Sequence, residues 1–222
     1  MSNHERDPEQ AACYPTPVLI ENFNPNVVLP HGLTTDHICS AMNEFVDFIG
    51  FINQQLNGRN IERLESMLMA ANFSSIVGEF MTSAIPKYCP TLVKNNHHNG
   101  HPDLVPKGMY PRDAAQHEKI GIEVKGSRYL KAWQGHNAED TWLMVFCFES
   151  SRPTDNYKGV IAKPFEYLAV YGAELEEADW TFAGRSETSR RTITASINSS
   201  GYKKMTSNWI YVQPKLKAKL GL

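Results

Sequence analysis

The sequence predicts an α/β or α+β fold in which a mixed central β-sheet is flanked by helices. Between about residues 34 and 86, apolar residues recur at intervals of three and four, as in amphipathic helices. From residue 90 to residue 222, short apolar runs alternate with polar or Gly/Pro-rich connections, as in a set of strands. A chain of 222 residues suits one domain with a sizeable core. We therefore expect a single domain, residues 1–222, with a helical N-terminal part and a sheet core.

The N-terminal part is expected to begin as an irregular arm and to continue as a helix. Residues 1–33 are rich in Pro and Asn and show little periodicity, so we expect them to wrap the surface or to reach a partner. Thr35 or Asp36 is expected to cap the first helix, and Asn57-Gly58 to end it.

Two further helices and several strands complete the prediction. Helical spacing predicts helices over residues 61–71 and 73–85, with Pro86 beyond the end of the second. An acidic turn is expected at residues 174–179. Strands are expected at residues 92–93, 101–105, 120–124, 142–148, 165–171, 191–197 and 209–212, and a short helix at residues 199–207.

Composition limits the class of protein and its compartment. The longest apolar run, residues 142–148, is far shorter than the roughly 20 residues that span a bilayer. The polar N-terminus has no apolar segment of the kind found in secretory signals. The four cysteines contain no CxxC pair and are expected to be reduced thiols of a cytoplasmic protein.

Charge is distributed unevenly along the chain. The net charge of −2 divides into +7 for residues 185–222 and −9 for residues 1–184. Such asymmetry is expected when one face of a protein meets phosphates and another meets solvent or a partner subunit. A solvated basic tail is the alternative interpretation for the C-terminal lysines.

Two short segments carry the candidate chemistry, His-Pro-Asp-Leu-Val at residues 101–105 and Ile-Gly-Ile-Glu-Val-Lys at residues 120–125. Glu123 and Lys125 are two residues apart in a β-favouring run, so we expect them on one face of a strand. Hairpin-like pairing of the two runs would bring Asp103 beside Glu123. Two carboxylates suit a hard cation, and an adjacent lysine can stabilise a phosphate in the transition state. The alternative is a turn residue beside a surface ion pair.

Pro102-Asp103, the 19 intervening residues and Glu123-Val124-Lys125 together resemble the signature of the PD-(D/E)XK nuclease superfamily, and within it the type II restriction endonucleases. The resemblance covers roughly residues 73–148. It implies a restriction-endonuclease-like fold and Mg²⁺-dependent hydrolysis of DNA that leaves 3′-hydroxyl and 5′-phosphate ends. It also implies that Asp103, Glu123 and Lys125 are catalytic and that Asp103 and Glu123 bind the metal.

Glu79 is a third candidate metal ligand. In the family that the chain resembles, an acidic residue on a helix before the Pro-Asp strand often adds to the metal site. Helix geometry places Glu79 about 60° from Ile76, on the flank of the predicted buried face. A solvated flank residue is the alternative.

Two regions are candidates for DNA contact: the polar loop after the Glu-Val-Lys strand, and the basic C-terminal part. Arg and Lys bind phosphates or guanine edges, and Asn and Gln can pair with adenine. The candidate residues are Arg128, Lys131, Gln134, His136, Asn137, Arg185, Arg190, Arg191, Lys203 and Lys204. An ordinary connection and a solvated edge strand are the alternatives.

The stretch that contains Cys89, His97, His98 and His101 lacks the paired spacing of zinc sites. We interpret these histidines as members of a loop near a nuclease cleft.

The functional hypothesis is a sequence-specific type II restriction enzyme that acts on double-stranded DNA. Two-fold symmetric DNA sites favour a homodimer. One alternative keeps the fold but assigns it to repair, recombination or a mobile element. Another is a non-catalytic DNA-binding protein that uses the basic C-terminal region and binds in a salt-sensitive way.

Overall fold

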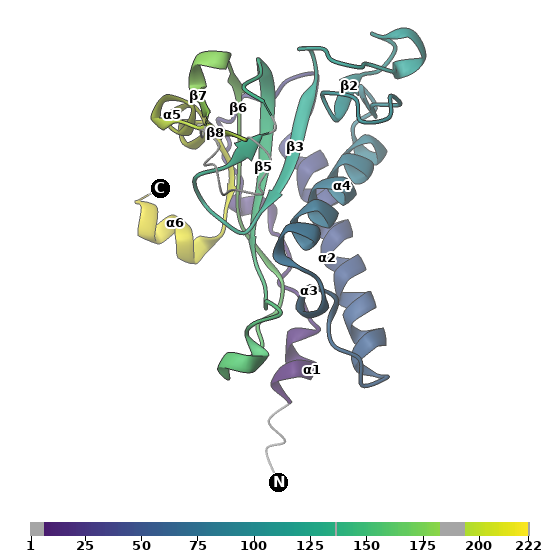
Figure 1. Ribbon diagram of the computed structural model, residues 1–222, viewed down its shortest axis with the longest axis vertical. Coiled ribbons are helices and arrows are strands. Elements are labelled where there is room, and N and C mark those ends of the chain that lie inside the picture. The colour runs from purple at the N-terminus through teal and green to yellow at the C-terminus, as the bar shows by residue number, and fades with distance from the viewer. Residues whose placement is uncertain (1–6, 136, 183–193, 222) are drawn as a thin grey trace, which may run out of the picture.

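A six-stranded mixed sheet forms the centre of the computed structural model, which describes residues 7–135, 137–182 and 194–221. The strand order is β1-β2-β3-β5-β6-β9, and neighbours run antiparallel except for the parallel pair β3 and β5. The strands are β1 (Leu92–Lys94), β2 (Leu104–Pro106), β3 (Ile122–Ser127), β5 (Thr141–Glu149), β6 (Glu166–Leu175) and β9 (Trp209–Val212). The predicted class, a mixed sheet flanked by helices, is confirmed (Figure 1).

Helices α2 (Thr35–Asn57) and α4 (Ala70–Tyr88) lie beside one another against one face of the sheet (Figure 1). Their apolar stripes meet the sheet in a core rich in aromatic side chains, because period-3.6 and period-2 patterns place those residues on facing surfaces. The ring of Phe45, for example, lies 5.0 Å from that of Phe165. The shorter helices on this part of the chain are α1 (Pro8–Ala12), η1 (Ile20–Asn22), α3 (Leu64–Met67) and η2 (Pro111–Asp113).

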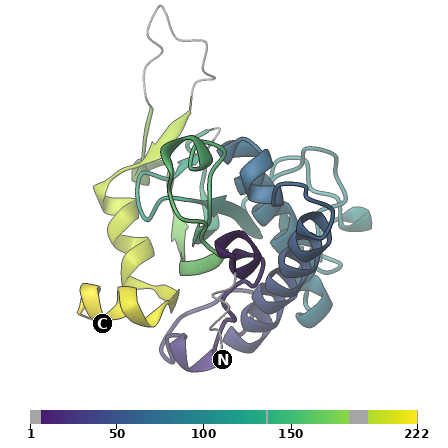
Figure 2. The same cartoon turned by 90° about the horizontal axis from the view of Figure 1, so that it is seen from below.

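The opposite face of the sheet is covered by C-terminal elements and by a small second sheet (Figure 2). A second core that includes Trp133, Leu143, Tyr171 and Met205 lies between them and the central sheet. The elements of this layer and its connections are β4 (Gln134–Gly135), β7 (Trp180–Phe182), β8 (Ala195–Ile197), α5 (Ser199–Ser207), α6 (Pro214–Leu220), η3 (Asn156–Lys158) and η4 (Glu177–Asp179), with the small sheet ordered β4-β8-β7.

The helices differ from the prediction near residues 34–36 and 61–71. The cap of α2 is Thr34, whose hydroxyl accepts the His37 N–H, and not Thr35 or Asp36. The predicted continuous helix over residues 61–71 is wrong, because α3 covers only Leu64–Met67, Leu68 is extended, and α4 begins at Ala70. Arg63 is fully buried by contacts with distant parts of the chain, and these tertiary contacts override the helical spacing.

The end of α4 also differs from the prediction. Pro86 lies inside the helix, not beyond its end. A proline in the last turn removes one backbone hydrogen bond, and the helix still continues until the Cys89 N–H bonds to the Ile85 carbonyl.

Most predicted strands are confirmed with shifted ends. The run at residues 101–105 becomes a strand only at Leu104, because His101 instead forms an isolated bridge with His117. Glu174, expected in a turn, is part of β6. The predicted strand at residues 191–197 is described only from residue 194 and contains β8. Strands β4 and β7 and helix α6 had no counterpart in the prediction.

The described part of the N-terminal arm wraps the surface. The Asn24 side chain donates to the Trp209 carbonyl, and Phe23 forms a bridge with Tyr211. These contacts tie the arm to β9 at the edge of the sheet. Among the described residues, no helix combines the length and the apolar character needed to cross a membrane.

Candidate active site

The pairing of β2 with β3 places Asp103 beside Glu123. Leu104 is opposite Ile122 in this antiparallel pair, so the residue before β2 lies at the level of the residues that follow Ile122. Asp103 Oδ2 accepts the backbone N–H of Val124 at 2.8 Å. This hydrogen bond fixes the Asp103 carboxylate against the strand that carries Glu123.

Alternation along β3 separates its polar side chains from its apolar ones. Ile122 and Val124 belong to the core under α2 and α4, so Glu123 and Lys125 are on the other face. Lys125 Nζ donates to Glu123 Oε1 at 2.8 Å. Asp103, Glu123 and Lys125 all line one open cavity of about 1080 Å³, so the structure brings together the three residues that the sequence singled out.

Two glycines allow α4 to approach β3 closely. A Cβ atom on Gly126 would lie 2.3 Å from the Ser74 carbonyl oxygen, and one on Gly78 would lie 3.3 Å from the Gly126 nitrogen. The contact brings the next residue of α4, Glu79, to the cavity wall. The Glu79 side chain is 70% exposed, and its Oε2 accepts from Lys94 Nζ of β1 at 3.0 Å.

Asn95 holds the loop that leads to Asp103. Its buried side chain donates to the carbonyls of Pro102 and Ala115 and accepts the Ala115 N–H. Its backbone N–H donates to the Asp103 carbonyl at 2.9 Å. Gly121 supports the same segment from the other side: its φ is +152°, and a Cβ there would lie 2.3 Å from the Leu104 carbonyl oxygen. Asp103 therefore follows a loop whose backbone groups are hydrogen-bonded to Asn95.

Two further residues join the site: His101, which the sequence analysis placed in a loop near a nuclease cleft, and Glu139, which it did not name. His97, His98 and His101 of that loop all line the cavity. His101 Nδ1 lies 3.0 Å from Glu123 Oε2, and His101 Nε2 lies 3.2 Å from Glu139 Oε2. The second contact has the distance of an ion pair without the angles of a hydrogen bond. The place of His101 directly before Pro102-Asp103 was a usable signal. Glu139 had no such signal in the sequence, because only the folded structure shows that the segment before β5 lies beside His101.

The electrostatics of the site are unbalanced toward negative charge. Burial, and then the neighbouring Glu123 charge, raise the pKa of Asp103 to about 7. Burial opposes ionisation of Glu123 too, but its hydrogen bond with His101 and the nearby Lys125 hold its pKa below the usual range. Burial lowers the pKa of His101, yet Glu123 and Glu139 outweigh that effect and raise it. A cation beside the two carboxylates would offset their repulsion.

The residues present fit a hard divalent cation. Mg²⁺ is usually held by one or two carboxylates together with several waters. Asp103 and Glu123 supply such oxygen ligands on the wall of an open cavity. Within residues 7–135, 137–182 and 194–221, no three His, Cys, Asp or Glu side chains are grouped so that they could hold an ion by themselves. The two carboxylates would therefore bind such an ion together with water molecules.

Arg128 lies apart from the cavity, although it was a candidate for DNA contact. Its guanidinium group donates to the carbonyls of Ser150 and Ser151 at 3.0 and 3.2 Å. The same group lies 5.4 Å from the ring centre of Phe73 and 5.1 Å from that of Phe148. These contacts give Arg128 a packing role beside the core.

The other candidate DNA contacts differ in exposure and in their partners. Asn137 lines the cavity and donates to Glu139 Oε1 at 3.1 Å. Lys131, Gln134 and Lys203 are exposed, whereas Lys204 is paired with Asp179 at 2.6 Å. His136, Arg185, Arg190 and Arg191 lie outside the described residues.

Comparison with protein-family models, with curated proteins and with solved structures finds no match to this chain. The site consists of two adjacent half-buried carboxylates, an ammonium group bonded to one of them, and an imidazole between two glutamates, all beside a cavity.

Proposed function

We propose that this chain is a Mg²⁺-dependent endonuclease that hydrolyses phosphodiester bonds of double-stranded DNA, as a type II restriction enzyme does. The observation that supports this most is the convergence of Asp103, Glu123 and Lys125 on one cavity. The resemblance of Pro102-Asp103 and Glu123-Val124-Lys125 to the PD-(D/E)XK signature supports the same function. The mixed sheet flanked by helices is compatible with a restriction-endonuclease-like fold.

Asp103 and Glu123 would hold the Mg²⁺ ion, which when bound polarises a phosphate and favours ionisation of water. The chain's own groups prepare the rest of the reaction. The Val124 N–H and the loop that Asn95 holds keep the Asp103 carboxylate in place. Lys125 carries a compact positive charge at the cavity wall, where it would stabilise the negative charge that develops on the phosphate.

DNA would reach this cavity across its exposed rim. Asn137 at the cavity and the exposed Lys131, Gln134 and Lys203 are the described residues proposed to contact it. Glu79 is proposed as an additional ligand that must first release Lys94. A homodimer would place one active site on each strand of a two-fold symmetric DNA sequence.

The test is incubation of plasmid DNA with Mg²⁺ and either the wild type or Lys125→Ala, followed by sequencing of the ends. We expect discrete fragments from the wild type and a loss of rate of about 100- to 1000-fold in the variant, the size typical of removing one transition-state contact. Lys107→Ala is the matched control, since Lys107 is an exposed lysine just after β2 that is not among the cavity residues. Asp103→Ala should abolish cleavage.

Three other outcomes would contradict part or all of the proposal. A smear of fragments would indicate a nuclease without sequence specificity. Preference for branched or mismatched DNA would indicate a repair, recombination or mobile-element nuclease. Salt-sensitive binding without cleavage, unchanged by Asp103→Ala, would indicate a non-catalytic DNA-binding protein.

A further inference from the structure

We propose that His101 and Glu139 form a positioning pair that orients the Glu123 carboxylate for cation binding. This inference rests on the proposed function and adds two residues to it. Neither residue is proposed to touch the phosphate or the ion. Their role is to fix one oxygen of Glu123, so that the carboxylate presents a defined face to the cavity.

The geometry assigns the two oxygens of Glu123 to different partners. Oε2 meets His101 Nδ1 at 3.0 Å, and Oε1 meets Lys125 Nζ at 2.8 Å. A carboxylate bonded at both oxygens has little freedom to rotate about its last side-chain bond. The lysine is flexible and can move away when a cation arrives, whereas the imidazole is only 14% exposed and sits on a fixed loop. His101 is therefore the partner able to keep Glu123 oriented during binding.

The backbone of His101 is held at both of its polar groups. Its N–H donates to the Gln116 carbonyl at 3.1 Å, and its carbonyl accepts the Glu118 N–H at 3.0 Å. The ring also packs beside that of His117, with the ring centres 5.6 Å apart. These contacts leave the side chain little room to move without its loop.

Glu139 completes the arrangement from a separate segment. Its Oε2 lies 3.2 Å from His101 Nε2, an atom buried from solvent that has no hydrogen-bond partner among the described residues. Its other oxygen, Oε1, accepts from the Asn137 side chain. A carboxylate held in this way restrains the imidazole ring from the side opposite Glu123. Partners of this kind behind a ligand typically change metal affinity by 10- to 100-fold when they are removed.

The experiment is calorimetric titration of Mn²⁺ into the full-length protein without DNA. We expect His101→Ala to weaken Mn²⁺ binding about 10-fold, and His101→Asn, whose side-chain amide can replace the Nδ1 contact, to recover most of that loss. We expect Glu139→Ala to weaken binding about threefold, a smaller effect because Glu139 acts through His101. His37→Ala, in the first turn of α2 and not among the cavity residues, is the control and should bind like the wild type.

The double variant His101→Ala/Glu139→Ala decides whether the two residues act as one unit. If they do, it binds Mn²⁺ as weakly as His101→Ala alone. Equal affinity of His101→Ala and the wild type would overturn the inference, and so would a full additional loss from Glu139→Ala in the His101→Ala background. Glu139→Gln gives a second test if the alanine variant does not fold, and it should bind more weakly than the wild type.

Failure of this inference can be told apart from failure of the proposed function. If the wild type binds Mn²⁺ and cleaves DNA while His101→Ala does both equally well, only the positioning role is wrong. If the wild type neither binds Mn²⁺ nor cleaves, and Asp103→Ala changes nothing, both are wrong.

Discussion

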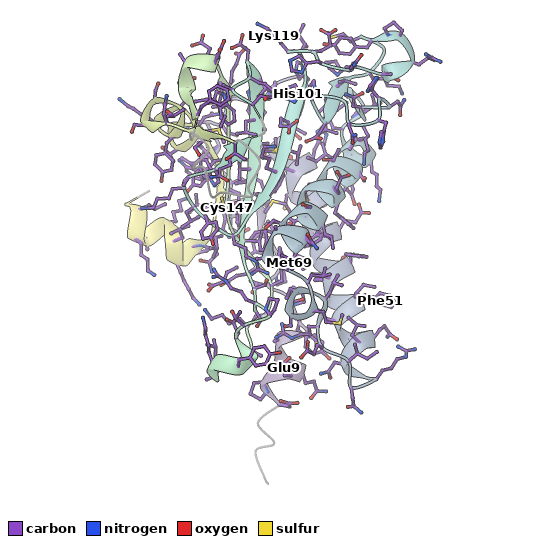
Figure 3. The ribbon with its side chains drawn as sticks, in the orientation of Figure 1. Glu9, Phe51, Met69, His101, Lys119 and Cys147 are labelled. Atoms are coloured by element: carbon purple, nitrogen blue, oxygen red, sulfur yellow. The ribbon has the colours of Figure 1, made fainter. Side chains whose placement is uncertain are left out.

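Two ionic clusters lie at opposite ends of the described part of the molecule, and they differ in how their charges are paired. One surrounds Arg63, with Glu9 at its rim, and the other contains His101 and the residues of the candidate active site (Figure 3). Both take charged groups out of water, which is costly unless the groups are paired and hydrogen-bonded. The two clusters differ in how completely their charged groups are paired and hydrogen-bonded.

The cluster around Arg63 is closed and satisfied. Arg63 is 1% exposed and donates to Glu9, Glu65, Ser151 and the carbonyl of residue 163. Glu65 is fully buried, and its second oxygen accepts from Asn53 at 2.9 Å. The single guanidinium of Arg63 contacts both carboxylates, and neither Arg63 nor Glu65 lines the large cavity.

The cluster around Glu123 is open to the cavity and has more acidic than basic side chains. Asp103, Glu123 and Glu139 are accompanied by Lys125 and by an imidazole, and all five residues line the cavity. The raised pKa of Asp103, caused first by burial and then by Glu123, expresses this imbalance. Buried groups that the fold leaves uncompensated beside a cavity are typical of functional sites. We therefore interpret the closed cluster as structural and the open cluster as the proposed metal site.

The largest expected effect concerns the closed cluster. Arg63→Ala would leave the buried Glu65 charge without its partner, and we expect a loss of about 3–5 kcal/mol in the free energy of unfolding. Chemical denaturation followed by circular dichroism measures it. Lys119→Ala, which breaks an exposed pair with Asp140 outside this cluster, is the control and should cost less than about 1 kcal/mol. A loss below 1 kcal/mol for Arg63→Ala would show that the two clusters are not energetically different.

In the open cluster, we expect removal of a charge to increase the stability of the fold. Asp103→Asn removes a buried negative charge beside Glu123 and keeps an oxygen that can accept the Val124 N–H. We expect the metal-free variant to be more stable than the wild type by about 2 kcal/mol at pH 8, while its cleavage activity is lost. Thermal and chemical unfolding in the presence of a chelator measure the gain. An Asp103→Asn protein less stable than the wild type would mean that the charge is well compensated.

The same comparison has a pH dependence with a defined sign. The pKa of Asp103 in the folded protein, about 7, lies above that of an aspartate in the unfolded chain. Between these two pKa values the folded protein therefore keeps a proton on Asp103 that the unfolded chain has released. Protonation of Asp103 contributes fully to the stability of the fold below about pH 4. This contribution declines as the pH rises and is lost above about pH 7. The stability difference between Asp103→Asn and the wild type should therefore be near zero at pH 4 and reach about half of its final value near pH 5.5. A difference that is constant across this range would contradict the assignment.

The sequence predicted the open cluster better than the closed one, for a physical reason. Residues two apart on a strand share a face whatever surrounds them, so the placement of Glu123 and Lys125 followed from local geometry. Pairing of two neighbouring apolar runs then brought Asp103 to the site. Arg63 gave no such signal, because its partners lie up to 100 residues away, and its burial is what broke the predicted helix.

The partners of side chains on loops and helix surfaces also could not be predicted from local sequence patterns. Arg128 looked like a DNA contact because it follows the active-site strand, but only the folded chain shows the carbonyls of residues 150 and 151 that it binds. Lys204 is similar, since its partner Asp179 comes from η4. Free energy gained by such pairing depends on neighbours that no spacing rule supplies.

The smallest expected effect is at the rim, where Glu79 and Lys94 form an exposed pair. Either Glu79→Gln or Lys94→Met should change the free energy of unfolding by less than about 0.5 kcal/mol.

The effects of these two substitutions on Mn²⁺ affinity should have opposite signs if Glu79 is a ligand. Glu79→Gln should weaken binding about threefold, and Lys94→Met should strengthen it because the carboxylate is released. Lys94→Met also removes a positive charge near the ion, which alone favours cation binding. The double variant separates the two causes, because a gain that persists without the Glu79 carboxylate comes from charge alone and removes Glu79 from the metal site.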